Sequence, residues 1–316
     1  NEIRPLMPMV YYHVWDNYPY PTFNKLAYES NDVILTISKV TDDIVKNVAP
    51  SVESRYVPHA VNSEIFGKLD SEKISNLRKL HIGENEEDVF VFFWNNRNAR
   101  RKQSGSLVWW FNEWAEKVGP DKVRLIMHTD PFDAQGQNLE SLLKELDALD
   151  GRIQFSKTKV DADALAAFYN MADCTINISD AEGFGLATLE SLACGTPIIV
   201  NMTGGLQEQV TDGNNWFGIG IEPSSKAIIG SQQVPFIHED RISKEDFHNA
   251  LDKIYNMPKN KRLEMGELGR EHAQENYNFK KLQKDWVDIM DNIHTKYGSW
   301  DTRALYESWT ATDIVL

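Results

Sequence analysis

The feature that most constrains the fold of this chain is a regular alternation of short apolar runs with helical periodicities. The runs are rich in β-branched residues, and the stretches between them repeat apolar residues at the spacing of amphipathic helices. Strands that alternate with helices in this way are typical of a parallel sheet whose two faces are covered by helices. We therefore predict an α/β fold. The predicted strands are residues 9–14, 33–38, 55–61, 89–94, 123–128, 152–155, 175–178 and 197–200.

The helical periodicity is clearest in two apolar stripes, whose residues follow the i, i+3, i+4, i+7 spacing of one helix face. The stripes consist of Leu107, Trp110, Phe111, Trp114 and Val118, and of Leu139, Leu142, Leu143, Leu146 and Leu149. Similar patterns predict helices over residues 70–81, 247–254 and 282–293. The polar residues 224–240 interrupt this rhythm, and we expect an ordered insertion or flap there.

Composition excludes several classes of protein. The chain has 316 residues, and its 33 basic and 47 acidic side chains give a net charge of −14. A content of 41% hydrophobic and 25% charged residues is typical of globular proteins and excludes a disordered chain. The acidic balance argues against a nucleic-acid binder, because phosphate neutralisation requires a basic surface. It also argues against electrostatic docking on anionic membranes.

The length suggests two domains at about 150 residues per domain. We predict a partial N-terminal Rossmann-like domain over residues 1–60 and a complete one over residues 61–278. We expect the C-terminal helices, residues 279–316, to cross back to the N-terminal part. The N-terminal part is small for a domain, because about 50 residues bury little surface.

The two cysteines, Cys174 and Cys194, lie in apolar stretches and can form neither a disulfide framework nor a C-x-x-C zinc pair. We therefore expect a cytoplasmic protein in a reducing compartment. No apolar run reaches the roughly 18 residues that cross a bilayer. We also expect no signal peptide.

The most informative segment is the turn that follows the predicted strand 175–178. In a doubly wound sheet, ligands bind at the carboxyl ends of strands, and Gly183 and Gly185 let the backbone approach a ligand closely. The following helix offers free N–H groups to a phosphate, while Glu182 and Glu190 can face the crevice. An ordinary tight turn with a solvated Glu190 is the alternative. The segment is not a dinucleotide fingerprint, because Thr188 occupies the third glycine position.

This segment resembles the signature of the family 4 retaining glycosyltransferases, which have the GT-B fold. The signature pairs Glu182 with Glu190, separated by seven residues. The similarity continues through residues 193–197 (ACGTP) and 204–208 (GGLQE), and through the helix 165–173 that precedes the strand. The loop from Arg97 to Lys102 resembles the family's R-x4-K loop. Residues 58–62 resemble its interdomain P-x-G-V-N segment, with Ala60 in place of glycine.

The resemblance implies a GT-B-like hexosyltransferase that retains anomeric configuration and takes a nucleoside-diphosphate sugar as donor in its C-terminal domain. Arg97 and Lys102 match the cations that neutralise the donor pyrophosphate. Glu182 matches the catalytic glutamate near the transferred sugar, and Glu190 the one that binds the ribose hydroxyls. The remaining donor-site positions implied are Gly183, Phe184, Gly185, Leu186, Gly204, Gly205, His128 and Val160.

Several of these residues also fit other roles. The stretch from Arg97 to Lys102 could be a solvated basic loop. His13, near the end of the strand 9–14, matches a family histidine that lines the cleft, but a strand-end histidine is often structural. Asp161 and Asp163 imitate an Asp-x-Asp metal motif, and we instead expect an N-terminal helix cap. We expect no metal and no cofactor, since the eight histidines lack metal-ligand spacing.

The family's N-terminal domain would need about 100 more residues than this chain supplies. We therefore expect a truncated chain, or one completed by a partner or a second copy. The first hypothesis is a glycosyltransferase with a sugar, lipid or protein acceptor. The alternatives are a donor-binding module without transferase activity of its own and a nucleotide-sugar epimerase, against which the pair of Glu182 and Glu190 argues.

Overall fold

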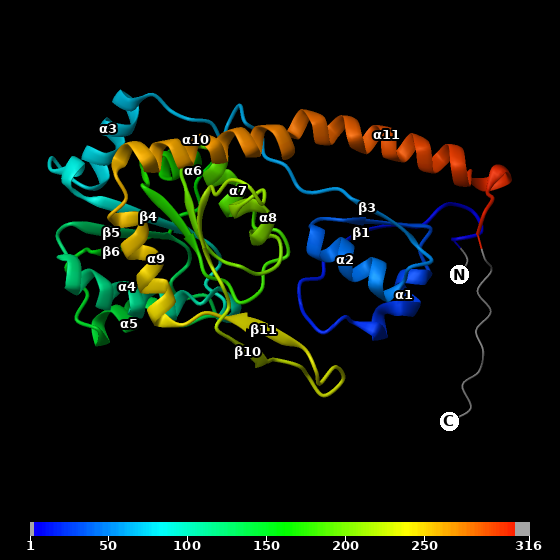
Figure 1. Ribbon diagram of the computed structural model, residues 1–316, viewed down its shortest axis with the longest axis horizontal. Helices are drawn as coiled ribbons and strands as arrows, with labels where there is room; N and C mark the ends of the chain where they lie inside the picture. Colours follow the sequence, from blue (N-terminus) through cyan, green and yellow to red (C-terminus); the bar gives the residue numbers. More distant parts are fainter. Residues whose placement is uncertain (1–2, 307–316) are drawn as a thin grey trace.

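The larger of two parallel sheets forms the centre of the C-terminal part of the molecule. The computed structural model describes residues 3–306. This sheet has six parallel strands in the order β6-β5-β4-β7-β8-β9 (Figure 1). Its strands are β4 (Phe90–Asn95), β5 (Val123–His128), β6 (Ile153–Ser156), β7 (Cys174–Asn177), β8 (Ile198–Asn201) and β9 (Gly218–Ile221).

Helices cover both faces of this sheet. Along β4, Phe90, Phe92 and Trp94 pack into one buried cluster, whereas Val91 and Phe93 pack into another. Because both faces of the strand are buried, its sequence is continuously apolar rather than alternating. The first face is covered by α4 (Ser104–Val118), α5 (Leu139–Glu145) and α9 (Lys244–Tyr255), and the second by α6 (Ala162–Met171), α7 (Leu186–Ala193), α8 (Leu206–Val210) and α10 (Lys259–Asn276). The charged helix α3 (Ser71–His81) packs against α6.

The strand order places a topological switch point between β4 and β7. The chain builds outward from β4 through β5 to β6, and then returns to build β7, β8 and β9 on the other side. In open α/β sheets, ligands bind at the carboxyl ends of the strands at such a point. The segments that follow β4 and β7 are therefore the expected position of a site.

The second sheet is smaller and parallel, with the order β1-β2-β3. Its strands are β1 (Val10–His13), β2 (Val33–Thr36) and β3 (Glu53–Tyr56), and its connecting helices are α1 (Lys25–Glu29) and α2 (Lys39–Val48). On one face, Ile34 packs with residues of α2. On the other, Val33 and Leu35 pack against Ile293 and Tyr297 of α11 (Phe279–Tyr297).

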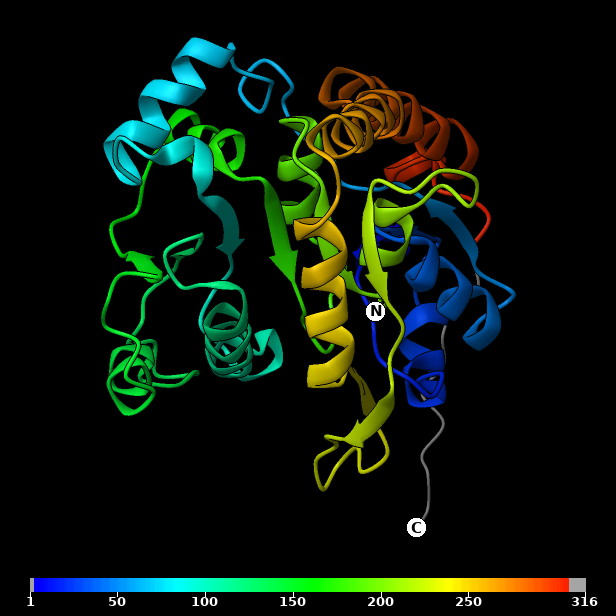
Figure 2. The same ribbon diagram turned by 60° about the vertical axis from the view of Figure 1, so that its left-hand side comes forward.

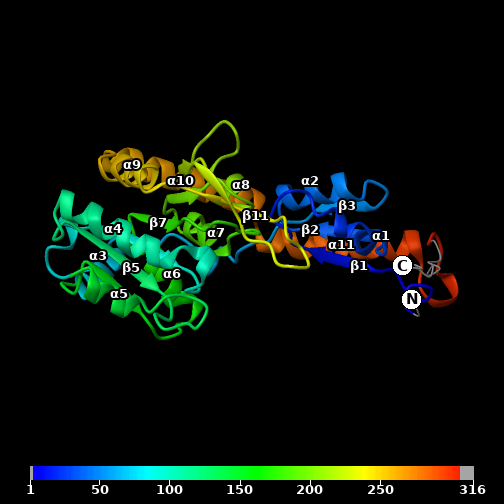
Figure 3. The same ribbon diagram turned by 90° about the horizontal axis from the view of Figure 1, so that it is seen from below.

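The chain crosses between the two sheets twice. The first crossing follows β3, and the second is the break between α10 and α11, which run along the whole length of the molecule in Figure 1. The two crossings touch, because the Val61 N–H donates a hydrogen bond to the Tyr277 carbonyl at 3.1 Å. Seen from below in Figure 3, the two sheets lie at opposite ends of the long axis.

The structure confirms the predicted strand–helix alternation and differs from it in four places. The strand β3 covers Glu53–Tyr56 and ends earlier than predicted, since Pro58 lacks the N–H that a continuing strand would need. The helix α5 ends at Glu145, and Leu149 of its predicted stripe is 67% exposed. The strand β9 is not among the predicted strands, because glycines interrupt its apolar sequence. Its Gly218 packs directly on the Ile198 carbonyl of β8. The polar residues 224–240 contain an antiparallel hairpin of β10 (Ser225–Ile228) and β11 (His238–Arg241).

Three smaller expectations can also be compared with the structure. The Asp161 carboxylate caps α6 by accepting a hydrogen bond from the Ala164 N–H at 2.8 Å, as predicted. Cys174 and Cys194 are buried and free. Within residues 3–306, no helix is both long enough and apolar enough to cross a membrane.

Candidate functional site

A cavity of about 620 Å³ lies between the two sheets, at the switch point of the larger one. Residues that follow β4 and β7 form its C-terminal wall, and residues that follow β1 form its N-terminal wall. The C-terminal wall includes Asn96, Arg101, Ala181, Glu182, Gly183, Phe184, Gly185, Leu186, Ala187 and Glu239. The other wall includes Val14, Trp15, Asp16, Asn17, Ile37 and His59.

The turn after β7 is shaped by glycines at which a side chain would collide with neighbouring groups. A Cβ on Gly183 would lie 2.3 Å from Val14 Cγ2 of the opposite wall. Gly185 has a φ of +94° and precedes α7 without a side-chain cap, so the first N–H groups of this helix remain available at the cavity. A Cβ on Gly204 would lie 1.9 Å from the Glu182 carbonyl. The neighbouring Gly205 N–H donates to that carbonyl at 2.9 Å.

Glu182 lines the cavity and forms a buried ion pair with Lys102. The Asn177 Nδ2 and the Ser179 Oγ lie 3.5 Å from the same carboxylate oxygen. Burial lowers the pKa of the Lys102 ammonium, and the adjacent Glu182 carboxylate opposes that change. The pair therefore places one cation and one anion side by side at the carboxyl ends of β4 and β7.

Two groups from the loop after β4 that the sequence analysis did not single out also face the cavity. Arg101 lines it and donates from its guanidinium to the Ala181 carbonyl at 2.5 Å. The Asn96 Nδ2 is buried and has no hydrogen-bond partner among the described residues. A ligand in the cavity could accept hydrogen bonds from both groups.

The structure does not bring Arg97 to the cavity. Its guanidinium is bound by both carboxylate oxygens of Asp133, at 2.6 and 3.2 Å, and its side chain is 60% exposed. Arg101 occupies the position at the cavity that the spacing assigned to Arg97. Both arginines belong to one short basic loop, whose sequence indicates that a cation lies near the cavity. The sequence does not show which of the two arginines turns inward.

Glu190 lies on α7, is not among the residues that line the cavity, and is held by a short chain of hydrogen bonds. Its Oε2 accepts a hydrogen bond from the Tyr169 hydroxyl at 2.7 Å, and that hydroxyl accepts one from the Asn95 Nδ2 at 2.9 Å. Burial raises the pKa of the Glu190 carboxyl, and the Tyr169 hydrogen bond opposes this. No described residue donates to the other oxygen, Oε1, so it can accept a hydrogen bond from a ligand hydroxyl.

The two histidines of the predicted site do not line the cavity. His13 is buried beside Tyr28, whose hydroxyl lies 2.8 Å from the His13 Nε2, and burial lowers the pKa of His13 to about 4. His128, at the end of β5, has its Nδ1 2.9 Å from the Ser156 Oγ. Asp16, three positions after His13, is the charged residue that this segment presents to the cavity.

The other predicted residues form or support the turn. Leu186 lines the cavity, and Phe184 is buried against the rings of His59 and Tyr277. Gly204 and Gly205 pack behind the turn rather than against the cavity. Val160 lies between β6 and α6 and is not among the lining residues.

The hairpin β10–β11 closes one side of the cavity. Glu239, on β11, is bound by the Arg100 guanidinium through two hydrogen bonds of 2.9 Å. The neighbouring Asp180 is paired with Arg241 at 2.9 Å. These ion pairs attach the hairpin to the loops that follow β4 and β7. Figure 2 shows the hairpin projecting beyond the rest of the molecule.

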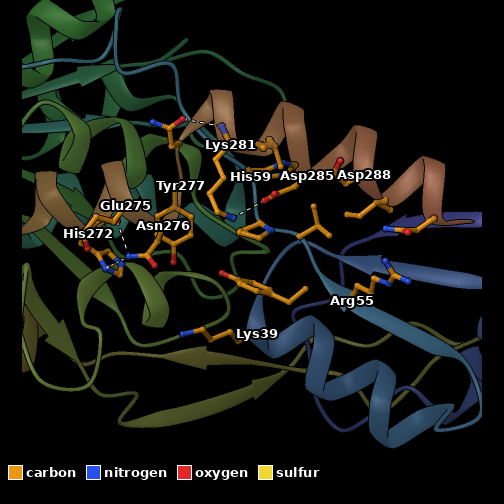
Figure 4. Close-up of a pocket in the computed structure, with 18 residues that line it drawn as sticks. Lys39, Arg55, His59, His272, Glu275, Asn276, Tyr277, Lys281, Asp285 and Asp288 are labelled. Carbon is orange, nitrogen blue, oxygen red and sulfur yellow. Dashed lines mark hydrogen bonds and ion pairs between the residues drawn. The ribbon is translucent and has the colours of Figure 1, made fainter.

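A second cavity, of about 440 Å³, lies beneath α11 at the two interdomain crossings (Figure 4). Lys39 and Arg55 line it from the N-terminal side, and Asp285 and Asp288 line it from α11. None of the site residues predicted from the sequence lines this cavity. Within residues 3–306, no group of three or more His, Cys, Asp or Glu side chains is arranged to hold a metal ion.

Two comparisons with solved structures define the class of fold. Sucrose-phosphate synthase from Thermosynechococcus elongatus superposes with a TM-score of 0.69 at 22% identity, over 86% of this chain and 61% of that one. Alr3699/HepE from Anabaena, in complex with UDP-glucose, superposes with a TM-score of 0.69 at 16% identity, over 90% and 72%. The fold is that of the GT-B glycosyltransferases.

Sequence comparison relates part of the larger domain to a known family. Residues 132–272 match the family described as Glycosyl transferases group 1. The N-acetyl-alpha-D-glucosaminyl L-malate synthase of Bacillus anthracis is 23% identical over 239 residues, which is 74% of this chain and 58% of that protein. The mannosylfructose-phosphate synthase of Agrobacterium fabrum is 29% identical over 161 residues, 49% and 35% respectively. The chain thus spans little more than half of the first relative and about a third of the second.

Proposed function

We propose that this protein is a retaining glycosyltransferase that moves a hexose from a nucleoside-diphosphate sugar to an acceptor hydroxyl without a metal ion. The observation that carries this proposal is the meeting of Arg101, Glu182 and the uncapped start of α7 in one cavity at the switch point, with Lys102, which does not line the cavity itself, paired to Glu182. A departing nucleoside diphosphate gains negative charge, and fixed cations and helix N–H groups stabilise such charge.

The donor pyrophosphate would lie between the loop after β4 and the start of α7. Lys102 and Arg101 would supply positive charge there, and the unpartnered Asn96 Nδ2 would donate a hydrogen bond. Arg97 would join them only after leaving Asp133. Two or three side-chain cations replace the charge that a metal supplies in other phosphoryl sites.

The two glutamates would hold the sugar and the ribose. Glu182 lines the cavity beside Lys102, where it can accept hydrogen bonds from the hydroxyls of the transferred hexose. The free Oε1 of Glu190 can accept from the ribose hydroxyls while Oε2 remains bonded to Tyr169. Backbone N–H groups from Gly183 to Leu186 complete the sugar site.

In the proposed reaction, the acceptor oxygen bonds to the anomeric carbon as the bond from that carbon to the diphosphate oxygen breaks. Attack on the face that the leaving group occupies would retain the anomeric configuration. The similar Alr3699/HepE of Anabaena is in complex with UDP-glucose in its crystal structure, which makes a uridine diphosphate donor the first to test.

Binding is tested by calorimetry with UDP and GDP on the wild type, on Glu190→Gln and on Glu271→Gln, an exposed control on α10. Loss of hydrogen bonds to a charged group costs about 1.5–3 kcal/mol, so Glu190→Gln should weaken diphosphate binding about tenfold or more. The control should bind as the wild type does. Absence of binding of either diphosphate to the wild type would refute the proposal.

A second candidate is a donor-binding module that needs further polypeptide, from a partner or a second copy, for transfer. It is favoured by the short span of this chain relative to its relatives, 58% of one and 35% of another. Diphosphate binding without turnover of any tested nucleotide sugar would support this candidate. An epimerase would instead convert the donor sugar without any acceptor.

A further inference from the structure

The N-terminal wall of the main cavity differs in chemistry from the wall that would hold the donor. It presents Val14, Trp15, Asp16, Asn17 and Ile37, with His59 from the crossing segment. Among these described residues, Asp16 is the one with a full charge, and none is a lysine or an arginine. Arg101 lines the opposite wall, where Lys102 is paired with Glu182 without lining the cavity itself.

Asp16 lies where a reacting group is expected. It follows the carboxyl end of β1, and ligands of parallel sheets bind at such ends. Its carboxylate is close enough to Arg101, Lys102 and Glu182 for all of them to affect its protonation. No other described residue donates a hydrogen bond to it. A partly buried carboxylate without a hydrogen-bond donor is costly, and this favours a functional reason for its presence.

We propose that Asp16 binds the attacking hydroxyl of the acceptor and takes its proton, and that the acceptor is an uncharged polyol or sugar. This inference rests on the proposed glycosyl transfer. The hydroxyl oxygen forms its bond to the anomeric carbon, and its proton passes to the Asp16 carboxylate. The nucleoside diphosphate leaves with the electron pair of the broken bond, so atoms and charge balance.

The class of acceptor follows from the charges that remain once the donor is bound. The donor pyrophosphate would occupy Arg101 and Lys102, and Arg100 already neutralises Glu239. Asp16 then faces the acceptor as an uncompensated charge, and so does Glu182, because Lys102 is its partner in the absence of a ligand. An acceptor phosphate or carboxylate beside either carboxylate would be repelled. Trp15 offers a ring face for the C–H groups of a sugar. Its orientation is fixed because the indole N–H donates to the Asn17 carbonyl at 2.9 Å.

Burial raises the pKa of the Asp16 carboxyl, with Glu182 acting in the same direction and Arg101 and Lys102 against it. A carboxylate with a raised pKa is the stronger base. The transfer rate should therefore fall on the acid side as Asp16 takes up a proton, at a pH above the ordinary aspartate value. Replacing the carboxyl group should remove this fall in rate at low pH, the acid limb of the pH profile.

The test measures transfer from UDP-glucose and GDP-mannose to glucose and myo-inositol and to their monophosphates, with products identified by mass. The variants are Asp16→Asn, Asp16→Glu and the exposed control Asp121→Asn, each compared by melting temperature and by UDP affinity. General base catalysis contributes about 10²-fold or more, so Asp16→Asn should lose that factor in kcat with UDP affinity within twofold. Asp16→Glu should recover part of the rate and keep the acid limb.

Transfer by Asp16→Asn at the wild-type rate, or faster transfer to the phosphorylated acceptors, would overturn this inference. So would a wild type that binds UDP and transfers to none of the neutral acceptors. A wild type that binds neither UDP nor GDP would refute the proposed function itself, which separates the two failures. If Asp16→Asn does not fold, Asp16→Glu is compared with the wild type in rate and in pH profile. A rate and a pH profile identical to those of the wild type would then overturn the role of Asp16.

Discussion

At the scale of single residues, the buried pair of Lys102 and Glu182 has two roles that can be separated. Its side chains are 9% and 12% exposed, so each charge depends on the other for stability in the absence of a ligand. Removing one partner of a buried pair leaves an uncompensated charge, whereas replacing both partners by neutral groups does not. Donor binding, by contrast, would need the positive charge of Lys102 itself.

We therefore expect Lys102→Gln to lower the free energy of unfolding by about 3 kcal/mol and to weaken UDP binding. The double variant Lys102→Gln/Glu182→Gln should recover most of the stability without recovering UDP affinity. Urea denaturation and calorimetry on the single and double variants measure both quantities. Equal loss of stability in the single and double variants would show that the pair does not act as described.

How far the sequence predicts these residues depends on how local their determinants are. The turn from Glu182 to Gly185 could be predicted because strand, glycines and helix follow one another within a few residues. The inward turn of Arg101 could not, since Asp133, distant in sequence, holds Arg97 outside. Asp16 could not be predicted either, because a strand pattern does not show which residue after β1 reaches the opposite wall.

At the scale of elements, the hairpin β10–β11 connects the larger domain to the segment after β1. The His238 N–H donates to the Tyr18 carbonyl at 2.8 Å, and the two rings stack with centroids 6.4 Å apart. These two strands could not be predicted from the sequence, because Ser225–Ile228 and His238–Arg241 are short, polar and lack an alternating apolar pattern. Their stability comes from cross-strand and interdomain contacts.

His238→Ala should remove the stacking contact, worth about 0.5–1.5 kcal/mol, and loosen the hairpin locally. Hydrogen exchange of residues 225–241 should accelerate, while β7 and β8 keep their protection. The matched control is Lys226→Ala, an exposed residue of β10 in the same hairpin. Comparable acceleration in the control would mean that the Tyr18 contact is not what holds the hairpin.

At the scale of the whole molecule, Glu208 on α8 joins the two domains. Its carboxylate accepts hydrogen bonds from the Lys39 N–H at the start of α2 and from the Tyr56 hydroxyl on β3, both at 2.8 Å. α8 begins directly after Gly205, which is bonded to the Glu182 carbonyl. One short helix therefore contacts both the turn of the main cavity and the N-terminal sheet.

Glu208→Gln should weaken the association of the domains. The new amide NH₂ group would face either the Lys39 N–H or the Tyr56 hydroxyl, and one of the two hydrogen bonds to Glu208 would be lost. We expect a loss of about 2 kcal/mol in the free energy of unfolding and a larger radius of gyration by small-angle X-ray scattering. Glu275→Gln, an exposed residue on α10 beside the same crossings, is the control. An unchanged radius with unchanged stability would argue against the interdomain role of Glu208.

The adjacent crossings also set the mechanics of the molecule. The bond from Val61 to the Tyr277 carbonyl ties the two connecting segments at one place, between α10 and α11. Since α11 packs on the smaller sheet, it moves with that sheet as one body. The bonds of Glu208 to Lys39 and Tyr56, and of His238 to Tyr18, link the same two bodies at other points. The width of the cavity between its two walls therefore depends on these few contacts, and a ligand that touches both walls would add one more link between the bodies.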